Sequence, residues 1–349
     1  MFDTVKLAIP LVLSEGELLA VNWTKTNSST KNPGEVDEVK TIFYMFHDDS
    51  FIGSPFIRYT SKENDFSVGW LKVEVSIPKF ICGANVYELE GNDLDNFFKV
   101  LKKYLSIHLK VPLSRIPSKE QWGVEKVHVC KNFSVGNLVK HYLCAASKQT
   151  IPKFKRRHYY SKGSNDIETI EWIATKKKEK FYDKEAELLQ KADYEEKDRH
   201  LRRAAGLLRY EIELSDTEIR LISPDRKAVE VLRPQVAIEA LQKGIKRIGL
   251  NQGVKYSCLK HVINTINHAE LDKRTRSSLI AFATEWIVSS EDKCRSKYSN
   301  NNFYKNKKRL RKVLGINELL LSDISLPPLE VMCERKKDCH CSSETIAVS

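Results

Sequence analysis

The sequence predicts an α+β fold, in which an antiparallel β-sheet packs on helices and a mainly helical C-terminal region follows. Three observations predict it. Short alternating segments separated by turn signals run from Asp3 to about Phe133, further alternating segments recur from 168 to 215, and helical periodicity dominates beyond Asp225. A chain of 349 residues is also long enough to bury one large core or two ordinary ones.

The segment from Met1 to Val21 predicts a first strand rather than a signal peptide or a membrane span. Its apolar stretch LAIPLVL is interrupted by Pro10, is too short to cross a bilayer, and lacks a basic flank and a small-residue cleavage site. The chain has eight cysteines but no secretory signal, so we expect reduced thiols. These features predict a cytoplasmic protein without a membrane partner.

The next elements follow from alternation and helical spacing. In GWLKVEVSIPKF, Leu71, Val73 and Val75 share one face while Lys72 and Glu74 share the other, which predicts a half-buried strand that continues to residue 77. Apolar residues at helical spacing predict a helix over 94–110, capped by residue 92 or 93. A second strand over 124–129 and a helix over 137–147 complete this part.

The middle of the chain begins with KQTIPKFKRRHYYSKGS, which contains no acidic residue and predicts an exposed loop or ribbon. Residues 168–174 and 179–182 then predict the two strands of a hairpin, with three consecutive lysines at its turn. A charged helix is expected over 184–206, and LLRYEIELS at 207–215 predicts another alternating strand.

The charge balance predicts a polyanionic partner. The formal net charge is +12 and the pI is near 9.1, and each Lys or Arg placed on a phosphate releases condensed counterions. Nucleic acid is the first candidate. A solvated basic surface without a partner is the alternative that charge alone leaves open.

Three polar residues fall on the polar faces of predicted strands. They are Glu74, His128 and Glu211, and together they offer the oxygen and nitrogen ligands that suit Mg²⁺ or Mn²⁺. Each alone is typical of a solvated surface group, and their convergence depends on the order of the strands.

The segment EKFYDKEAEL adds a candidate nucleophile. Tyr182 and Lys184 share a face if the strand continues, and Glu187 follows one helical turn later. Because a tyrosine hydroxyl has a pKa near 10, attack on phosphorus at neutral pH needs a nearby positive charge or a base. The alternative is an amphipathic edge tyrosine beside a surface lysine.

Five blocks resemble, in order, those of the filamentous-phage gene II replication proteins and their plasmid-borne relatives. The first two are MFDTVKLAIP and VEVSIPKFICGANVYEL. GVEKVHVCKNF stands where the family has Arg-Ile-Asp-Val and an aromatic residue, TIEWIATKKKEKFYDKEAEL resembles the segment with the nucleophilic tyrosine, and GLLRYEIEL resembles the Arg-aromatic-Glu strand after it. NNFYKNKKRLRKVLGINEL resembles a C-terminal element of the phage proteins, so the resemblance extends to about residue 320.

The resemblance implies a rolling-circle replication initiator whose catalytic core is of the HUH-nickase or Rep-like type. The family's Tyr-x-Lys element falls on Tyr182 and Lys184, and its strand carboxylates fall on Glu74 and Glu211. His128 replaces the family's Asp, and since imidazole is also a metal ligand, this departure changes the expected metal preference.

The implied activity is that of a metal-dependent DNA nicking-closing enzyme. Mg²⁺ or Mn²⁺ held by the three ligands polarises a phosphate, and Tyr182 attacks it to give a 5′-phosphotyrosyl enzyme and a free 3′ hydroxyl. Lys184 stabilises the developing charge. Glu187 shuttles a proton or orients Lys184, or it forms an ion pair with Lys184 or Lys191. The expected partners are origin DNA, single-stranded or supercoiled, and host helicase and polymerase; the oligomeric state is open.

We expect a catalytic domain over 1–222, a helical and basic DNA-binding or accessory region over 223–326, and a disordered tail over 327–349. The expected DNA contacts are basic and aromatic side chains near the family motifs and in the acid-free and C-terminal basic segments: Lys79, Lys153, Lys155, Arg156, Arg157, Tyr159, Lys176, Lys177, Arg209, Lys305, Lys307, Lys308, Arg309 and Arg311.

Two other functions remain open at this point. One is a non-catalytic DNA-binding replication or copy-control protein on the same fold, in which Tyr182 only stacks on a base; the other is an RNA-binding protein. The tail residues Cys333, Cys339, His340 and Cys341 do not have the spacing of common zinc ligands, so we do not expect zinc there.

Overall fold

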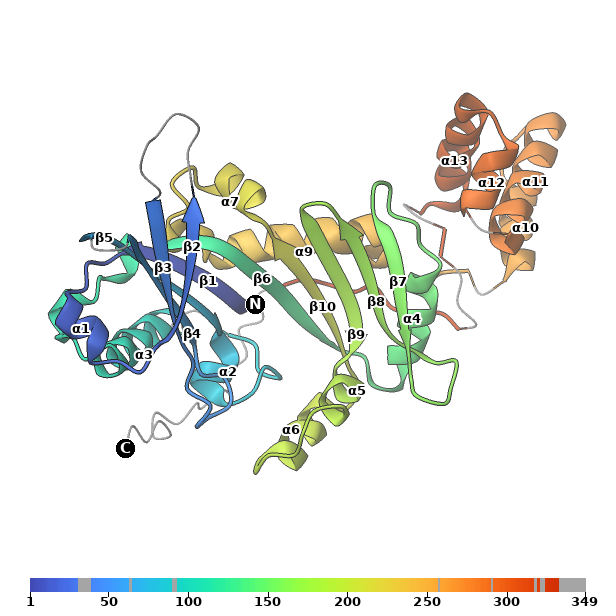
Figure 1. The fold of residues 1–349 in the computed structure, drawn as a ribbon. Helices are drawn as coiled ribbons and strands as arrows, with labels where there is room; N and C mark the ends of the chain where they lie inside the picture. Colours follow the sequence, from blue (N-terminus) through green and yellow to red (C-terminus); the bar gives the residue numbers. More distant parts are fainter. Residues whose placement is uncertain are drawn as a thin grey trace. The chain divides into compact units, whose positions relative to one another are not determined.

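The computed structural model describes residues 1–30, 39–62, 65–89, 93–256, 258–289, 291–316, 319–320 and 324–332. The fold is α+β, as the alternation predicted: it has a large antiparallel sheet of ten strands, together with helices that include most of the chain after residue 215 (Figure 1). No described helix has the length and the apolar composition needed to cross a bilayer. The five described cysteines are free thiols.

The chain divides into two compact units. The first comprises Met1–Cys130, Glu213–Ile238 and Met332, and the second comprises Lys131–Ile212 and Glu239–Val331. Strands β6 (Gly123–Ser134) and β10 (Leu207–Leu214) each contribute residues to both units.

The first unit contains six neighbouring strands in the order β2-β3-β4-β5-β1-β6. Leu71, Val73 and Val75 are buried, which confirms the predicted alternation. The strand ends at Ser76 rather than at residue 77, because Pro78 lies in the first turn of a helix that begins at Ile77. The elements of this unit are β1 (Phe2–Pro10), α1 (Glu15–Leu19), β2 (Thr24–Thr30), β3 (Val39–Phe46), β4 (Phe56–Lys62), β5 (Asp65–Ser76), α2 (Ile77–Cys82), α3 (Asp93–His108), α7 (Asp216–Ile222) and α8 (Ala228–Val231).

The second unit contains four neighbouring strands in the order β10-β9-β8-β7. One face of these strands is apolar and fully buried through Ile170, Trp172, Phe181 and Tyr210. The expected single helix over 184–206 is two helices, since residues 190–196 are not helical. The elements are α4 (Val139–Ser147), β7 (Lys155–Tyr160), β8 (Ile167–Ala174), β9 (Lys177–Asp183), α5 (Lys184–Leu189), α6 (Lys197–Ala204) and most of α9 (Pro234–Ile248).

Four further helices of the second unit share a hydrophobic core of their own. They are α10 (Leu259–His268), α11 (Lys273–Ser289), α12 (Glu291–Lys297) and α13 (Asn300–Leu314), and we call them the α10–α13 bundle (Figure 1). Their core is built around Phe282, Trp286, Phe303 and Leu310.

The start of the expected disordered tail is packed against the second unit. Leu329 and Val331 are buried, and the Leu329 N–H donates to the carbonyl of Leu250. Residues 333–349, with the three tail cysteines and His340, lie outside the described residues.

Candidate functional site

Tyr182 lies at the C-terminal end of β9, where the strand meets α5. The side chain of Asp183 accepts hydrogen bonds from the N–H groups of Glu185 and Ala186, which caps the helix and places Lys184 at its first position. Strand alternation places Phe181 on the apolar face and Tyr182 on the other face.

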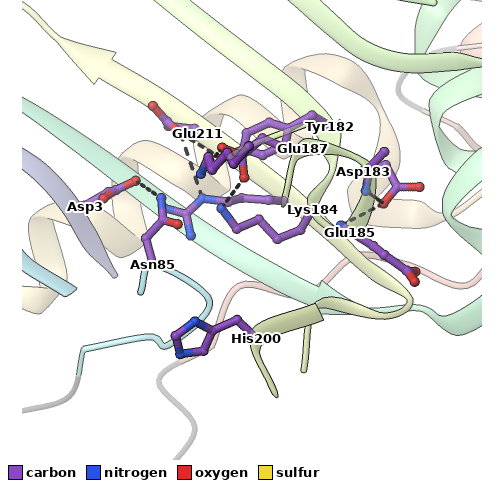
Figure 2. Close-up of polar contacts among 12 residues, drawn as sticks. Asp3, Asn85, Tyr182, Asp183, Lys184, Glu185, Glu187, His200 and Glu211 are labelled. Carbon is purple, nitrogen blue, oxygen red and sulfur yellow. Dashed lines mark hydrogen bonds and ion pairs between the residues drawn. The ribbon is translucent and has the colours of Figure 1, made fainter. Parts of the chain in front are cut away.

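Tyr182 forms a hydrogen bond with a neighbouring carboxylate. Its hydroxyl donates to Oε2 of Glu211 on β10 over 3.3 Å, and the two residues are only 7% and 9% exposed (Figure 2). Arg209 precedes Glu211 by two residues and so shares its face; its Nε lies 3.9 Å from Glu211 Oε2, and its side chain is fully buried. Arg209 also donates from Nη1 to Oδ1 of Asn132 over 3.3 Å. The three side chains therefore lie in a row, in which the Tyr182 phenol contacts the Glu211 carboxylate and this carboxylate faces the Arg209 guanidinium.

Lys184 adds a second buried positive charge beside the phenol. Its Nζ lies 5.7 Å from the centre of the Tyr182 ring and donates to Oε2 of Glu187 over 2.7 Å (Figure 2). Burial, followed by the charge of Arg209, lowers the pKa of Lys184 to about 8, although Glu187 opposes the shift. Burial raises the pKa of Glu187, but Lys184 and Lys191 outweigh burial, so that the net shift of this pKa is downward. Glu187 also forms an ion pair with Lys191.

The three expected metal ligands each have a separate partner. Glu74 Oε1 lies 3.4 Å from Nζ of Lys126, and His128 Nε2 lies 3.4 Å from Oε2 of Glu213. Glu211 faces Tyr182 and Arg209 as described. Within the described ranges, no group of three or more His, Cys, Asp or Glu side chains is arranged to hold a metal ion. Glu74 and His128 belong to the first of the two units and Glu211 to the second, and we derive no step through a metal.

Basic side chains occupy the sheet face that carries Tyr182. The register pairs Thr169 with Tyr182 and also with Tyr159, which puts these three residues in one row across β7, β8 and β9. By the same register, the adjoining rows of this face contain four basic residues, which we call the cationic strip: Lys155, Arg157, Lys178 and Lys180.

One carboxylate lies within the cationic strip. Glu171 accepts a hydrogen bond from the hydroxyl of Tyr159 over 2.9 Å and forms ion pairs with Lys178 at 2.8 Å and Lys180 at 3.5 Å. Its burial raises its pKa, but these partners outweigh burial and lower the pKa overall. The strip therefore keeps a net positive charge.

Lys155 and Arg157 are among the DNA contacts predicted from the sequence, whereas Lys178 and Lys180 are not. The alternation of side chains along β9 identifies them. Counted back from Tyr182 in steps of two, residues 180 and 178 lie on the same face of β9 as Tyr182, and Lys177 lies on the opposite face. The missed lysines are each about one third exposed.

The other residues that were expected to contact DNA differ in how much of each side chain is exposed. Arg209 is fully buried and Lys307 is 8% exposed, so neither presents its charge to a surface ligand in this structure. Lys307 instead lies 2.5 Å from Glu291 and 4.8 Å from the Trp286 ring centre. Arg156 is exposed but donates to the carbonyl of Gln149 over 2.8 Å. The remaining ones are exposed or half-exposed: Lys79, Lys153, Tyr159, Lys176, Lys177, Lys305, Lys308, Arg309 and Arg311.

No protein family, curated protein or solved structure matches this chain.

Proposed function

We propose that the chain is a rolling-circle replication initiator with an HUH-nickase or Rep-like core, which nicks one DNA strand through Tyr182. The observation that supports this most directly is the series of Tyr182, Glu211 and Arg209, in which a nucleophile contacts a base and the base contacts a positive charge. This is the arrangement that an activated oxygen nucleophile needs. The resemblance of the five sequence blocks supports the same activity.

In the proposed reaction the Tyr182 oxygen attacks phosphorus while Glu211 accepts the phenolic proton. A bond forms between this oxygen and phosphorus, and the bond from phosphorus to the 3′ oxygen breaks. The leaving oxygen takes up a proton from water and becomes a 3′ hydroxyl, and Glu211 returns the phenolic proton to the solvent, so that no net proton is consumed. The charges of Lys184 and Arg209 offset the negative charge that develops. One ester replaces another, so no nucleotide cofactor is required.

The cationic strip supports single-stranded DNA as the substrate. Its basic side chains lie beside Tyr159, which is 46% exposed and in the same row as Tyr182. Positive charge with an aromatic ring is typical of surfaces that bind unpaired bases.

The test uses supercoiled plasmid that carries the DNA flanking the coding sequence, with Mg²⁺ or Mn²⁺ and without either. We expect the protein to nick the plasmid and to form a covalent adduct whose phosphotyrosyl peptide contains residue 182. Tyr182→Phe abolishes both products, and Glu211→Gln lowers the nicking rate by about 10²-fold or more, as the loss of a general base does.

Tyr160→Phe is the matched control, since Tyr160 is an exposed tyrosine of the same sheet, on strand β7. It should nick at the wild-type rate. Undiminished nicking by Tyr182→Phe would remove this residue from the chemistry.

A second candidate is a DNA-binding replication or copy-control protein without catalysis. It is favoured by the 7% exposure of Tyr182, because DNA would have to displace neighbouring side chains to reach its hydroxyl. This candidate predicts specific binding of the same DNA by the wild-type protein, with no nicking under any metal condition.

A further inference from the structure

Positive charge is concentrated in the α10–α13 bundle. Residues 258–315 contain 13 Lys and Arg against 5 Asp and Glu, which is a net charge of +8 out of +12 for the whole chain. Helix α13 alone has six Lys and Arg and no acidic residue.

The packing of the bundle leaves several of these charges on one exposed face of α13. Phe303, Leu310 and Leu314 form the buried face of α13. The opposite face is exposed and holds four cations beside Tyr304, which is itself 53% exposed: Lys305, Lys308, Arg309 and Lys312. Among the described residues, none of these four cations forms an ion pair.

Two acidic residues of the bundle form ion pairs with cations outside this face. Glu291 pairs with Lys307 at 2.5 Å, and Glu285 pairs with Lys297 at 2.8 Å. Within the described part of the bundle, no carboxylate forms an ion pair with the four exposed cations of α13. Lys305, Arg309 and Lys312 follow i, i+4, i+7 spacing, so they form one stripe that is about 10 Å long along the helix axis.

We propose that the α10–α13 bundle binds double-stranded DNA and that α13 is the helix that contacts it. An α-helix is a rigid convex rod that fits the major groove of B-form DNA, and its cations can contact the phosphates on the groove edges. The major groove of duplex RNA is too narrow to admit it.

Two other anionic partners fit less well. A membrane-surface helix inserts an apolar face into lipid, whereas the apolar face of α13 is buried in the bundle core. Single strands are bound in positively charged grooves that follow the backbone, whereas the stripe of α13 lies on the convex surface of a helix. Duplex DNA is the partner that matches both charge and shape.

This binding does not depend on the proposed nicking reaction, because it involves none of the residues around Tyr182. To keep the two separate, every protein form in the test carries Tyr182→Phe. The probe is a fluorescent DNA duplex of about 20 base pairs, and its anisotropy is measured at salt concentrations from about 50 to about 200 mM. The triple variant Lys305→Ala, Arg309→Ala, Lys312→Ala removes the stripe.

The matched control removes three charges from α3 in the other unit, through Lys99→Ala, Lys102→Ala and Lys103→Ala. All six positions are helical and none is buried, so alanine preserves the fold, which circular dichroism verifies.

Three lost phosphate contacts lower the slope of log affinity against log salt by about 2.7 units. Over the stated salt range the parent protein should therefore lose about 40-fold more affinity than the α13 variant, while the α3 variant behaves as the parent does. Three results would overturn the proposal: an unchanged slope in the α13 variant, an equal loss in the α3 variant, or a dependence on the stripe that appears only with single-stranded DNA, duplex RNA or anionic vesicles.

Discussion

Lys184 has no exposed surface, and its position next to Arg209 makes its positive charge costly. Burial and Arg209 lower its pKa from 10.5 to about 8, despite the hydrogen bond to Glu187. Between these two pKa values the unfolded chain binds more protons at this residue than the folded chain does. The stability of the fold therefore rises with pH from about 8 upward, and the full penalty of the buried charge is present below that pH.

This pH dependence can be measured directly. From pH 8 to about 9.5, Lys184 should add about 2 kcal/mol to the free energy of unfolding, since one pKa unit corresponds to about 1.4 kcal/mol. Urea denaturation of Lys184→Met should lack this increment. Lys180→Met, which replaces a partly exposed lysine of β9, serves as the control and should keep the wild-type pH profile. The same increment in both variants would contradict the assignment to Lys184.

At the scale of the element, strand pairing joins separate sequence segments into one surface. The register places Arg157, Glu171 and Lys180 in one row across β7, β8 and β9. The opposite face of the same strands buries Ile170, Trp172 and Phe181, which keeps the three strands rigidly in place. The buried residues on the opposite face therefore hold the cationic strip in place, and none of the residues of the strip belongs to this core.

We expect Lys178→Gln with Lys180→Gln to weaken binding of a single-stranded oligonucleotide about tenfold, because two phosphate contacts are lost at moderate salt. Glutamine retains a hydrogen-bond donor for Glu171, which limits the loss of stability. Fluorescence anisotropy measures the affinity, and a thermal melt checks the fold.

The control for this prediction lies in the adjoining turn. Lys176→Gln with Lys177→Gln removes the same charge from residues that sequence reasoning selected but that lie in the turn and on the opposite strand face. Equal weakening by the two pairs would mean that general charge, rather than the strip, binds the strand.

At the scale of the whole molecule, two kinds of core stabilise the second unit, one with a buried carboxylate and one that is aromatic. Between its strands and α9, Tyr210 donates to the fully buried Glu179 over 2.7 Å, and Arg247 also pairs with this carboxylate. The α10–α13 bundle instead has an aromatic core in which Phe282 contacts the rings of Trp286 and Phe303. The bundle core is a separate cluster, so it can open by itself.

Phe282→Ala should therefore destabilise the bundle selectively. Loss of a buried phenyl ring costs about 3–5 kcal/mol. Hydrogen exchange should show faster exchange in α10–α13 and unchanged protection in β8 and β9. Val288→Ala, at a 72% exposed position of the same helix, should change neither region. Equal loss of protection in the strands would show that the bundle and the sheet unfold as one cooperative unit.

The local features of this protein follow from its sequence alone. Alternation identified several of the strands and their buried faces, as at Leu71 and Val73, and helical spacing identified the C-terminal region; β2, β3 and β4 were not identified individually. The sequence also placed Tyr182 at the end of a strand, one residue before the cap that starts α5. These features follow from periods of two and 3.6 residues, which neighbouring residues set without reference to the rest of the chain.

Which side chains meet across strands depends on the three-dimensional fold. It brought Tyr182 to Glu211, paired Glu74 with Lys126 and His128 with Glu213, and buried Arg209. The physical reason is that strand order and cross-strand register arise from pairings between segments far apart in the chain, and a period of two does not encode them.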